Sequence, residues 1–150
     1  MKYVAYGSNM IREQMALRCP DARLIGTGCI AGARLEFYLH ATVESSSDRG
    51  SRVPAAVWEI SKADEKSLDR YEGYPTYYTK DTCLVHMDDG TEIEGMIYLM
   101  KMIRNLPPHD DYYRGIENAY IQLGLQAQVK SVLEPALERS IRRSGGRTTI

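Results

Sequence analysis

The sequence predicts an α+β fold in which a mixed, barrel-like β-sheet is surrounded by peripheral helices. Strand-type patterns dominate residues 1–100, with two short helical segments inserted among them, and helical patterns dominate from about residue 111 to residue 141. This order lacks the regular strand–helix alternation of a doubly wound parallel sheet. A single domain covering residues 1–150 is expected, because typical domains contain about 100–150 residues.

The composition is typical of a folded protein that carries no strong overall charge. Hydrophobic residues make up 43% and charged residues 26% of the chain, and the formal net charge is −1. This balance argues against a nucleic-acid partner, because such proteins usually carry a basic field. No apolar run approaches the roughly 18–20 residues of a membrane span. We therefore expect neither a nucleic acid nor a membrane as partner.

Localisation is predicted from the N-terminal residues and the cysteines. The first apolar run breaks at Gly7, too early for the hydrophobic part of a signal peptide. Cys19, Cys29 and Cys83 are odd in number and lack CxxC spacing, which predicts reduced, structural thiols. We therefore expect a cytoplasmic protein, either a monomer or a homodimer.

The first predicted elements are a strand and a helix joined by a short polar loop. Lys2–Tyr6 is a β-branched and aromatic run that stops at a glycine, as strands do. Ser8 or Asn9 can cap a following helix, because either side-chain oxygen accepts from a free N–H of the first turn. The helix is expected over Met10–Arg18, since it must end before a proline.

Two β-type stretches and a loop are expected next. The stretches cover about residues 22–26 and 29–40, and in the second one apolar residues alternate with Glu36 and Tyr38. This period of two predicts a half-buried strand. Residues 43–52 are rich in serine and cannot bury enough apolar surface to order themselves, so we expect a mobile loop there.

The middle of the chain predicts a strand followed by a capped helix. Val53–Ile60 forms the strand, and Ser61 with Asp64 has the spacing of a capping box. The helix that this box opens is expected to run through about Glu72 and to end at Gly73, because glycine tolerates the left-handed conformation of a helix C-terminus.

Residues 77–150 predict a hairpin followed by a helical region. Strands over 77–87 and 91–100 flank Asp88-Asp89-Gly90, and Asp-Gly tolerates the positive φ of tight hairpin turns. Helices are expected from about 111 to 141, with a break near a glycine or a proline, namely Gly124 or Pro135. The end of the chain, about 142–150, is expected to be a frayed basic tail.

The loop from Tyr6 to Met10 is the first segment that could do chemistry. A helix that begins here would offer free N–H donors and the positive end of its dipole to an anion. Gly7 lets the backbone approach a ligand closely, and Ser8 and Asn9 add side-chain donors. A well-capped helix start with no further role explains the same residues, so both interpretations stay open.

Glu72 is the second candidate. Leu68 and Glu72 are four residues apart and share a helix face, so a buried Leu68 turns the Glu72 carboxylate towards the interior. Desolvation and the negative end of the helix dipole both raise the pKa of such a carboxylate towards neutrality. A general base or acid needs that pKa. Alternatively, Glu72 caps the following turn or pairs with Arg70.

Seven motifs along the chain, taken together, point to a family. They are Tyr6-Gly7-Ser8-Asn9, Arg18-Cys19-Pro20, Val53-Pro54-Ala55-Ala56-Val57-Trp58, Leu68-Asp69-Arg70-Tyr71-Glu72-Gly73, Tyr77-Tyr78, Ile97-Tyr98-Leu99-Met100 and Asp111-Tyr112-Tyr113. In this order and spacing the chain resembles the γ-glutamylcyclotransferase (AIG2-like) family over roughly residues 2–125.

The resemblance implies a mixed β-barrel and an enzyme that cyclises the γ-glutamyl group of a small molecule. The products would be 5-oxoproline and a free amino acid or amine, a reaction type of glutathione metabolism. It implies no metal and no cofactor. By position, Glu72 matches the catalytic glutamate of the family. The residues that match its substrate-binding loop and pocket tyrosines are Tyr6, Gly7, Ser8, Asn9, Tyr78 and Tyr113.

Two other functions are compatible with the same scaffold. One is a non-catalytic module that binds a small ligand or a partner. The other is an amidohydrolase, which would use water and release glutamate. It is disfavoured because the sequence shows no nucleophile–base pair and no metal-ligand spacing among His40, His86 and His109.

Overall fold

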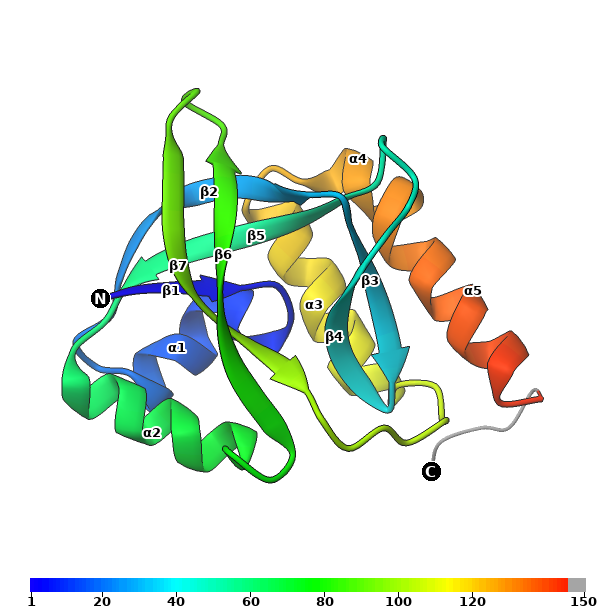
Figure 1. Cartoon of the computed structure of the whole chain (residues 1–150), viewed down its shortest axis with the longest axis horizontal. Helices are drawn as coiled ribbons and strands as arrows, with labels where there is room; N and C mark the ends of the chain where they lie inside the picture. Colours follow the sequence, from blue (N-terminus) through cyan, green and yellow to red (C-terminus); the bar gives the residue numbers. More distant parts are fainter. Residues whose placement is uncertain (146–150) are drawn as a thin grey trace.

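The computed structural model describes residues 1–145 and has a closed five-stranded β-barrel with helices packed around it (Figure 1). The barrel strands are β1 (Lys2–Ala5), β2 (Arg23–Ala31), β5 (Arg52–Glu59), β6 (Tyr78–Met87) and β7 (Glu92–Met100). The helices are α1 (Arg12–Arg18), α2 (Lys62–Glu72), α3 (Asp110–Gln122), α4 (Gln126–Gln128) and α5 (Glu134–Arg143). The predicted α+β class with a barrel-like mixed sheet is confirmed.

The barrel closes because β1 pairs with strands on both of its edges. It is antiparallel to β5 and parallel to β7, where Tyr3 pairs with Met96. The strand order around the barrel is β1-β5-β2-β6-β7. Strand β5 is buried from Val53 to Trp58, as expected for a strand that is covered on both faces.

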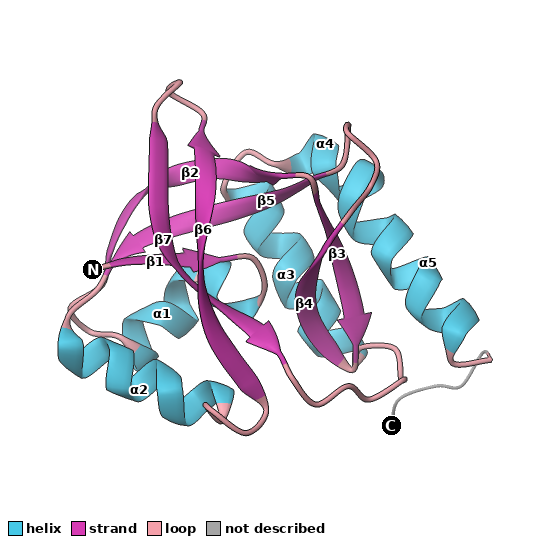
Figure 2. Ribbon diagram, viewed as in Figure 1, coloured by secondary structure: helices cyan, strands magenta, loops and turns pink. Residues whose placement is uncertain are grey.

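A two-stranded hairpin lies outside the barrel and packs against α5. It consists of β3 (Ala33–Tyr38) and β4 (His40–Ser45). Figure 2 shows α5 along β3, while α1 and α2 lie next to each other under the opposite end of the barrel. Because α5 covers the second face of β3, Glu36 is only 1% exposed. The expectation that the polar positions of this strand face solvent is therefore wrong for Glu36.

Two predicted boundaries in this region are also wrong. The stretch 29–40 is not one strand, because the chain turns at Gly32 with φ 66° and again at Leu39 with φ 68°. Residues 43–52 are not an irregular loop throughout, because β4 continues to Ser45. The hydrogen bonds from Gly32 N to Ser51 O and from Ser46 N to Gly32 O, both 2.9 Å, join the two ends of the remaining loop.

The other local predictions fare better. The capping box is present, with Ser61 Oγ accepting from Asp64 N at 3.1 Å and Asp64 Oδ2 accepting from Ser61 N at 3.1 Å. Helix α2 ends at Glu72, and Gly73 takes the left-handed conformation. The hairpin between β6 and β7 turns at the predicted Asp-Gly pair.

The C-terminal helical region is confirmed with one correction. The break falls at Gly124 and not at Pro135. A π-helical turn over Val129–Leu133 leads directly into α5, and Pro135 lies in the first turn of that helix. Arg142 and Arg143 belong to α5 and not to a frayed tail. Ser144 and Gly145 form a turn after α5, and residues 146–150 of the predicted tail lie outside the described residues.

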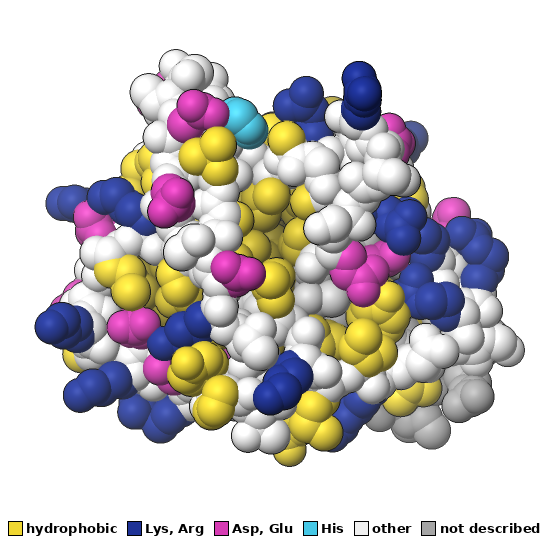
Figure 3. Space-filling view, in the orientation of Figure 1, with side chains coloured by type: hydrophobic (Ala, Val, Ile, Leu, Met, Phe, Trp, Pro, Cys, Tyr) yellow, Lys and Arg dark blue, Asp and Glu magenta, His cyan; other side chains and the backbone are white. Residues whose placement is uncertain are grey.

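The described surface carries interspersed charges. In Figure 3, acidic and basic side chains lie near one another towards the left and right of the visible face, while apolar and uncharged groups fill most of its middle. No helix within residues 1–145 is both long enough and apolar enough to cross a membrane.

Candidate active site

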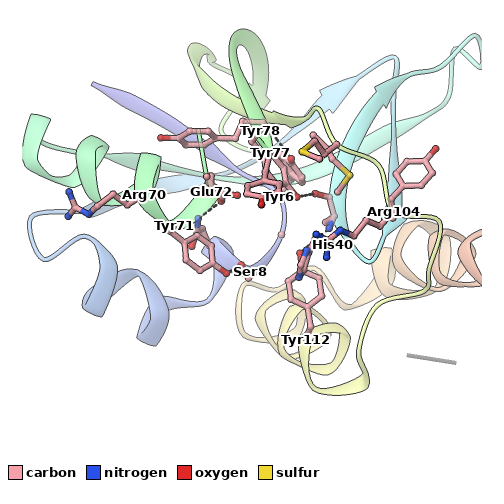
Figure 4. Close-up of a pocket in the computed structure, with 18 of the residues that line it drawn as sticks. Tyr6, Ser8, His40, Arg70, Tyr71, Glu72, Tyr77, Tyr78, Arg104 and Tyr112 are labelled. Carbon is pink, nitrogen blue, oxygen red and sulfur yellow. Dashed lines mark hydrogen bonds between the residues drawn. The ribbon is translucent and has the colours of Figure 1, made fainter. Parts of the chain in front are cut away.

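A cavity of about 430 Å³ opens at the end of the barrel where α2, β4 and α3 meet (Figure 4). Its walls come from widely separated parts of the chain. The lining residues are Tyr3, Tyr6, Gly7, Ser8, Asn9, Tyr38, His40, Ala41, Arg70, Tyr71, Glu72, Gly73, Tyr77, Tyr78, Tyr98, Met100, Met102, Arg104 and Tyr112. All but one of the sequence-predicted site residues therefore lie together.

Glu72 is the acidic side chain of this cavity. Leu68 is fully buried, and one helical turn later Glu72 lies partly buried in the cavity wall, as its spacing predicted. Asn9 Nδ2 donates a hydrogen bond to Glu72 Oε1 at 3.3 Å. Burial raises the pKa of Glu72 to about 7, and the nearby positive charge of Arg18 limits the rise. An ion pair with Arg70 is not seen among the described residues, and in Figure 4 Arg70 points away from Glu72.

The loop after β1 is held in place by hydrogen bonds at each of its residues. Tyr6 Oη donates to Tyr98 O at 2.6 Å, and Trp58 Nε1 donates to Asn9 O at 3.1 Å. Ser8 Oγ lies within hydrogen-bond distance of Tyr71 Oη, at 3.3 Å. These contacts fix the loop against β7, β5 and the end of α2.

The loop does not cap a helix in the predicted way. It forms a 3-10 turn over Ser8–Met10, and α1 begins only at Arg12, without a side-chain cap. Asn9 is not available for capping, because its amide donates to Tyr3 and Glu72 and accepts from Arg18. The predicted helix N-terminus at this loop is therefore wrong, although the loop itself lines the cavity.

Gly7 lies at a point of close approach. A Cβ atom on Gly7 would be 3.3 Å from Ala41 Cβ and 3.5 Å from Tyr112 Oη. Because glycine has no Cβ atom, Ala41 of β4 and Tyr112 of α3 can lie close to the loop, and they narrow the cavity beside Gly7.

Two tyrosines hold Ala41 of β4 against the cavity. Tyr78 Oη donates to Ala41 O at 2.8 Å, and Ala41 N donates to Tyr112 Oη at 3.0 Å. Burial raises the pKa of both phenols above their usual range, so both are neutral at pH 7. They can therefore act as neutral hydrogen-bonding groups next to the carboxylate.

Tyr113 does not line the cavity. Its ring packs against Phe37 with centroids 5.9 Å apart, and its hydroxyl is buried without a partner among the described residues. Successive residues of an α-helix point about 100° apart. The prediction therefore chose the wrong one of two adjacent tyrosines, and Tyr112 occupies the pocket position.

The chain is similar to proteins of one known family. The family model described as "Gamma-glutamyl cyclotransferase, AIG2-like" matches residues 3–117. The chain belongs to this family. It is similar to a gamma-glutamylcyclotransferase of Homo sapiens, with 29% identity over 87% of this chain and 77% of that protein. A gamma-glutamylcyclotransferase of Bos taurus is 28% identical over 76% of this chain and 66% of its own length.

Solved structures show the same relationship. A structure described as "Gamma-glutamyl cyclotransferase" superimposes with a TM-score of 0.77 and 26% identity, covering 92% of this chain and 98% of the other. The crystal structure of a Homo sapiens protein described as uncharacterized has the same TM-score at 29% identity, covering 87% and 86%. The barrel described above is thus the fold of gamma-glutamyl cyclotransferases.

Several cavity residues of this cyclotransferase family member were missed in the sequence. Tyr3 and Tyr98 reach the cavity from neighbouring strands, and the ladder that places them there is visible only in three dimensions. His40 is the first residue of β4 and Arg104 lies in the loop after β7, and neither position carried a local signal of a site. Tyr71, beside Glu72, could have been found from the Leu68–Gly73 motif.

The cavity offers acid–base chemistry without an evident thiol nucleophile or metal cluster. Within residues 1–145, no three His, Cys, Asp or Glu side chains are grouped as a metal site. Burial raises the pKa of the Cys19 thiol to about 12 and that of Cys83 to about 11, and neither lines the cavity. Burial raises the pKa of Glu72 to about 7, whereas burial lowers the pKa of His40, the imidazole in the wall of the same cavity.

Proposed function

We propose that this chain is a γ-glutamylcyclotransferase that converts a γ-glutamyl compound into 5-oxoproline and a free amino acid or amine. Glu72 acts as the general base and then as the general acid. The observation that carries this proposal is a carboxylate with a pKa of about 7 in the wall of the cavity. Membership in the gamma-glutamyl cyclotransferase family supports it.

The reaction moves two protons from the α-ammonium group of the substrate to the leaving nitrogen, and Glu72 carries the first of them. The α-ammonium group of the substrate is a poor nucleophile, so Glu72 first accepts its proton. The free amine attacks the γ-carbonyl carbon, and a C–N bond closes the five-membered ring. The bond to the leaving nitrogen breaks while the protonated Glu72 returns the proton to that nitrogen. After the attack the ring nitrogen still holds two protons; it loses one, and the released amine takes this proton up and leaves as an ammonium ion. Glu72 ends ionised, as it began, so protons and charge balance.

The cavity contributes mainly by holding the substrate in a ring-like conformation. Because the attacking nitrogen and the carbonyl belong to one molecule, correct folding of the substrate can supply effective molarities of roughly 10⁵–10⁸ M. The loop from Tyr6 to Asn9 and the hydroxyls of Tyr78 and Tyr112 surround the space beside Glu72. The Tyr112 hydroxyl accepts from Ala41 N and keeps its own proton, so it can donate to the oxyanion of the tetrahedral intermediate, whereas the Tyr78 proton is already donated to Ala41 O.

The test is the formation of 5-oxoproline from γ-glutamyl-alanine. Glu72→Gln keeps the shape of the side chain and removes the base, so kcat should fall by at least about 10²-fold. Glu13→Gln is a matched control, because Glu13 is exposed on α1, away from the cavity. It should retain wild-type activity.

Other products would identify the other functions. Release of glutamate instead of 5-oxoproline would indicate an amidohydrolase. Calorimetric binding of 5-oxoproline without turnover, unaffected by Glu72→Gln, would indicate a non-catalytic binding module.

A further inference from the structure

Arg18 is the strongest feature that the proposed mechanism leaves without a role. It is the last residue of α1, and its guanidinium stacks on the ring of Tyr71, with Cζ 3.4 Å from the ring centroid. It also donates a hydrogen bond to Asn9 Oδ1. Among residues 1–145 it forms no ion pair, so no carboxylate contact neutralises its charge.

The contact with Arg18 determines which way the Asn9 amide points. A guanidinium only donates hydrogen bonds, so it must face the amide oxygen. The amide nitrogen then points the other way, where it donates to Tyr3 Oη at 2.8 Å and to Glu72 Oε1 at 3.3 Å. A flipped amide would place its oxygen against the carboxylate, which repels it.

Arg18 is also the charged group that acts on Glu72. The other titratable side chains whose electrostatic effects link them to Glu72 are neutral phenols from β1, β6, β7, α3 and the loop after β1: Tyr3, Tyr6, Tyr78, Tyr98 and Tyr112. His40 and Arg104 line the same cavity. Arg18 is the group whose positive charge lowers the pKa of Glu72.

We propose that Arg18 is a positioning residue of the cyclotransferase reaction, which holds the Asn9 amide and the ionised carboxylate of Glu72 in the reactive arrangement. This inference rests on the proposed function. It gives the Arg18-Cys19-Pro20 motif a role, because the proline ends α1 at the point where its last side chain reaches the loop and the end of α2. Arg18 itself does not line the cavity and acts through Asn9 and Tyr71.

Three substitutions separate the charge from the hydrogen bond. Arg18→Met keeps an apolar chain on Tyr71 and loses both, Arg18→Gln keeps a donor for Asn9 without the charge, and Arg18→Lys keeps a donor and the charge. Arg12→Met, an exposed residue of the same helix, is the matched control. The readouts are kcat and KM from pH 5 to pH 9 and the ¹³C NMR titration of the Glu72 carboxyl group.

The expected result is a rise of about one unit in the Glu72 titration midpoint for Arg18→Met and Arg18→Gln. A one-unit rise lowers the ionised fraction at pH 7 from about one half to about one tenth, so kcat should fall at least about fivefold there and less at pH 9. Arg18→Met should lose further activity at every pH, because the Asn9 amide is no longer oriented. Arg18→Lys should keep the wild-type midpoint, and KM should change less than kcat.

An unchanged Glu72 titration midpoint in both Arg18→Met and Arg18→Gln would overturn the proposal. A kcat of Arg18→Lys that is no higher than that of Arg18→Met would also overturn it. Should Arg18→Met fail to fold in thermal unfolding, Arg18→Gln carries the test of the charge. The NMR titration needs no turnover. A wild-type protein that forms no 5-oxoproline would therefore reject the proposed function, while the titration midpoints would still judge the electrostatic role of Arg18.

Discussion

The Glu72 side chain lies at the end of a helix in a poorly solvated wall, and two measurable properties follow from this. Only the ionised form of Glu72 can take the proton of the substrate amine. Because its pKa is about 7, a neutral solution holds comparable amounts of base and acid forms. Both forms are needed in one turnover.

The first prediction at this scale is a pH profile. We expect kcat/KM for γ-glutamyl-alanine to rise with pH through a midpoint near 7, as Glu72 loses its proton. Glu13→Gln, a substitution at an exposed site, should show the same rise of kcat/KM with pH. A profile with no inflection between pH 6 and pH 8 in the wild type would contradict Glu72 as the base.

The second prediction concerns stability. The ordinary pKa of 4.5 is raised to about 7 in the folded state, so between these values the folded protein binds more protons than the unfolded chain. Stability must then fall as pH rises from about 4.5 to 7, by at most about 3 kcal/mol. Glu72→Gln removes this charge. It should be more stable than the wild type at pH 8, with the difference shrinking at pH 4.5.

Urea unfolding at both pH values measures this difference, with Glu13→Gln as the reference for a carboxylate outside the cavity. A Glu72→Gln protein that is less stable than the wild type at pH 8 would contradict the argument. The same substitution is thus expected to lower kcat by at least about 10²-fold and to increase stability at pH 8.

The sequence predicts single residues well where a local contact decides their direction. The four-residue spacing between Leu68 and Glu72 was enough to predict that the Glu72 side chain points inwards. The choice between Tyr112 and Tyr113 was not decided locally, because both side chains pack against other elements: Tyr112 lies against Gly7 of the cavity loop, and the rings of both tyrosines contact Phe37. Ser8 or Asn9 was expected to cap a helix, whereas the amide of Asn9 is occupied by Tyr3, Arg18 and Glu72.

At the scale of elements, the turn after α2 controls where Glu72 ends up. Gly73 has φ 64°, and a Cβ atom on it would be 2.4 Å from Cδ2 of Tyr77, a cavity residue. A side chain at this position meets two separate penalties, the left-handed backbone and the tyrosine ring.

The prediction for this turn compares two glycines. Gly73→Ala should destabilise the protein by more than the roughly 1–2 kcal/mol of the left-handed backbone alone, and it should lower kcat because Glu72 and Tyr77 shift. Gly90→Ala in the β6–β7 turn also has a positive φ, 89°, but a Cβ there meets no described atom within 4 Å. Gly90→Ala should lose only the roughly 1–2 kcal/mol of stability that the left-handed backbone costs, and its kcat should equal that of the wild type. Equal effects of both substitutions on stability and kcat would contradict this account.

Elements whose ends are determined by residues close to them in the sequence were predicted correctly. The Ser61 box, the Gly73 end and the Asp-Gly hairpin are local arrangements of side chain and backbone. The corner at Gly32 was missed, since a single glycine inside a β-type run does not tell a bulge from a reversal. Its direction is set by how β3 packs outside the barrel.

At the scale of the whole molecule, a buried charge cluster attaches α5 to the outer hairpin. Glu36 is 1% exposed and accepts from Arg139 Nε at 2.9 Å, while Arg34 and Arg143 approach its oxygens at 3.1 and 3.4 Å. Arg139 also donates to Leu35 O at 2.8 Å. Removing one partner leaves part of the buried carboxylate uncompensated.

Arg139→Met is therefore expected to destabilise the protein by about 2–3 kcal/mol, somewhat less than for an isolated buried pair because Arg34 and Arg143 stay in place. Arg142→Met, an exposed residue of the same helix, should change stability by less than about 0.5 kcal/mol. Thermal and urea unfolding check both values. The prediction fails if the two variants are equally stable.

The closure of the barrel was the part of the fold that residue patterns alone did not specify. Composition and strand order predicted a mixed, barrel-like sheet, but which strands pair depends on contacts between distant residues such as Tyr3 and Met96. The family resemblance supplied that information, because it relates the whole order of motifs to a known architecture. The outer position of β3 and β4, and with it the place of His40, followed only from the coordinates.

The parallel contact between β1 and β7 joins the first strand of the chain to the last strand of the sheet. Until that seam forms, Tyr6 has no Tyr98 carbonyl to bind, and a nascent chain that has not yet emerged past residue 112 lacks a wall of the pocket. Once the proposed turnover is measured, only molecules with a closed barrel will form 5-oxoproline during refolding. The time course with which this activity recovers will therefore follow the slowest step in the closure of the barrel.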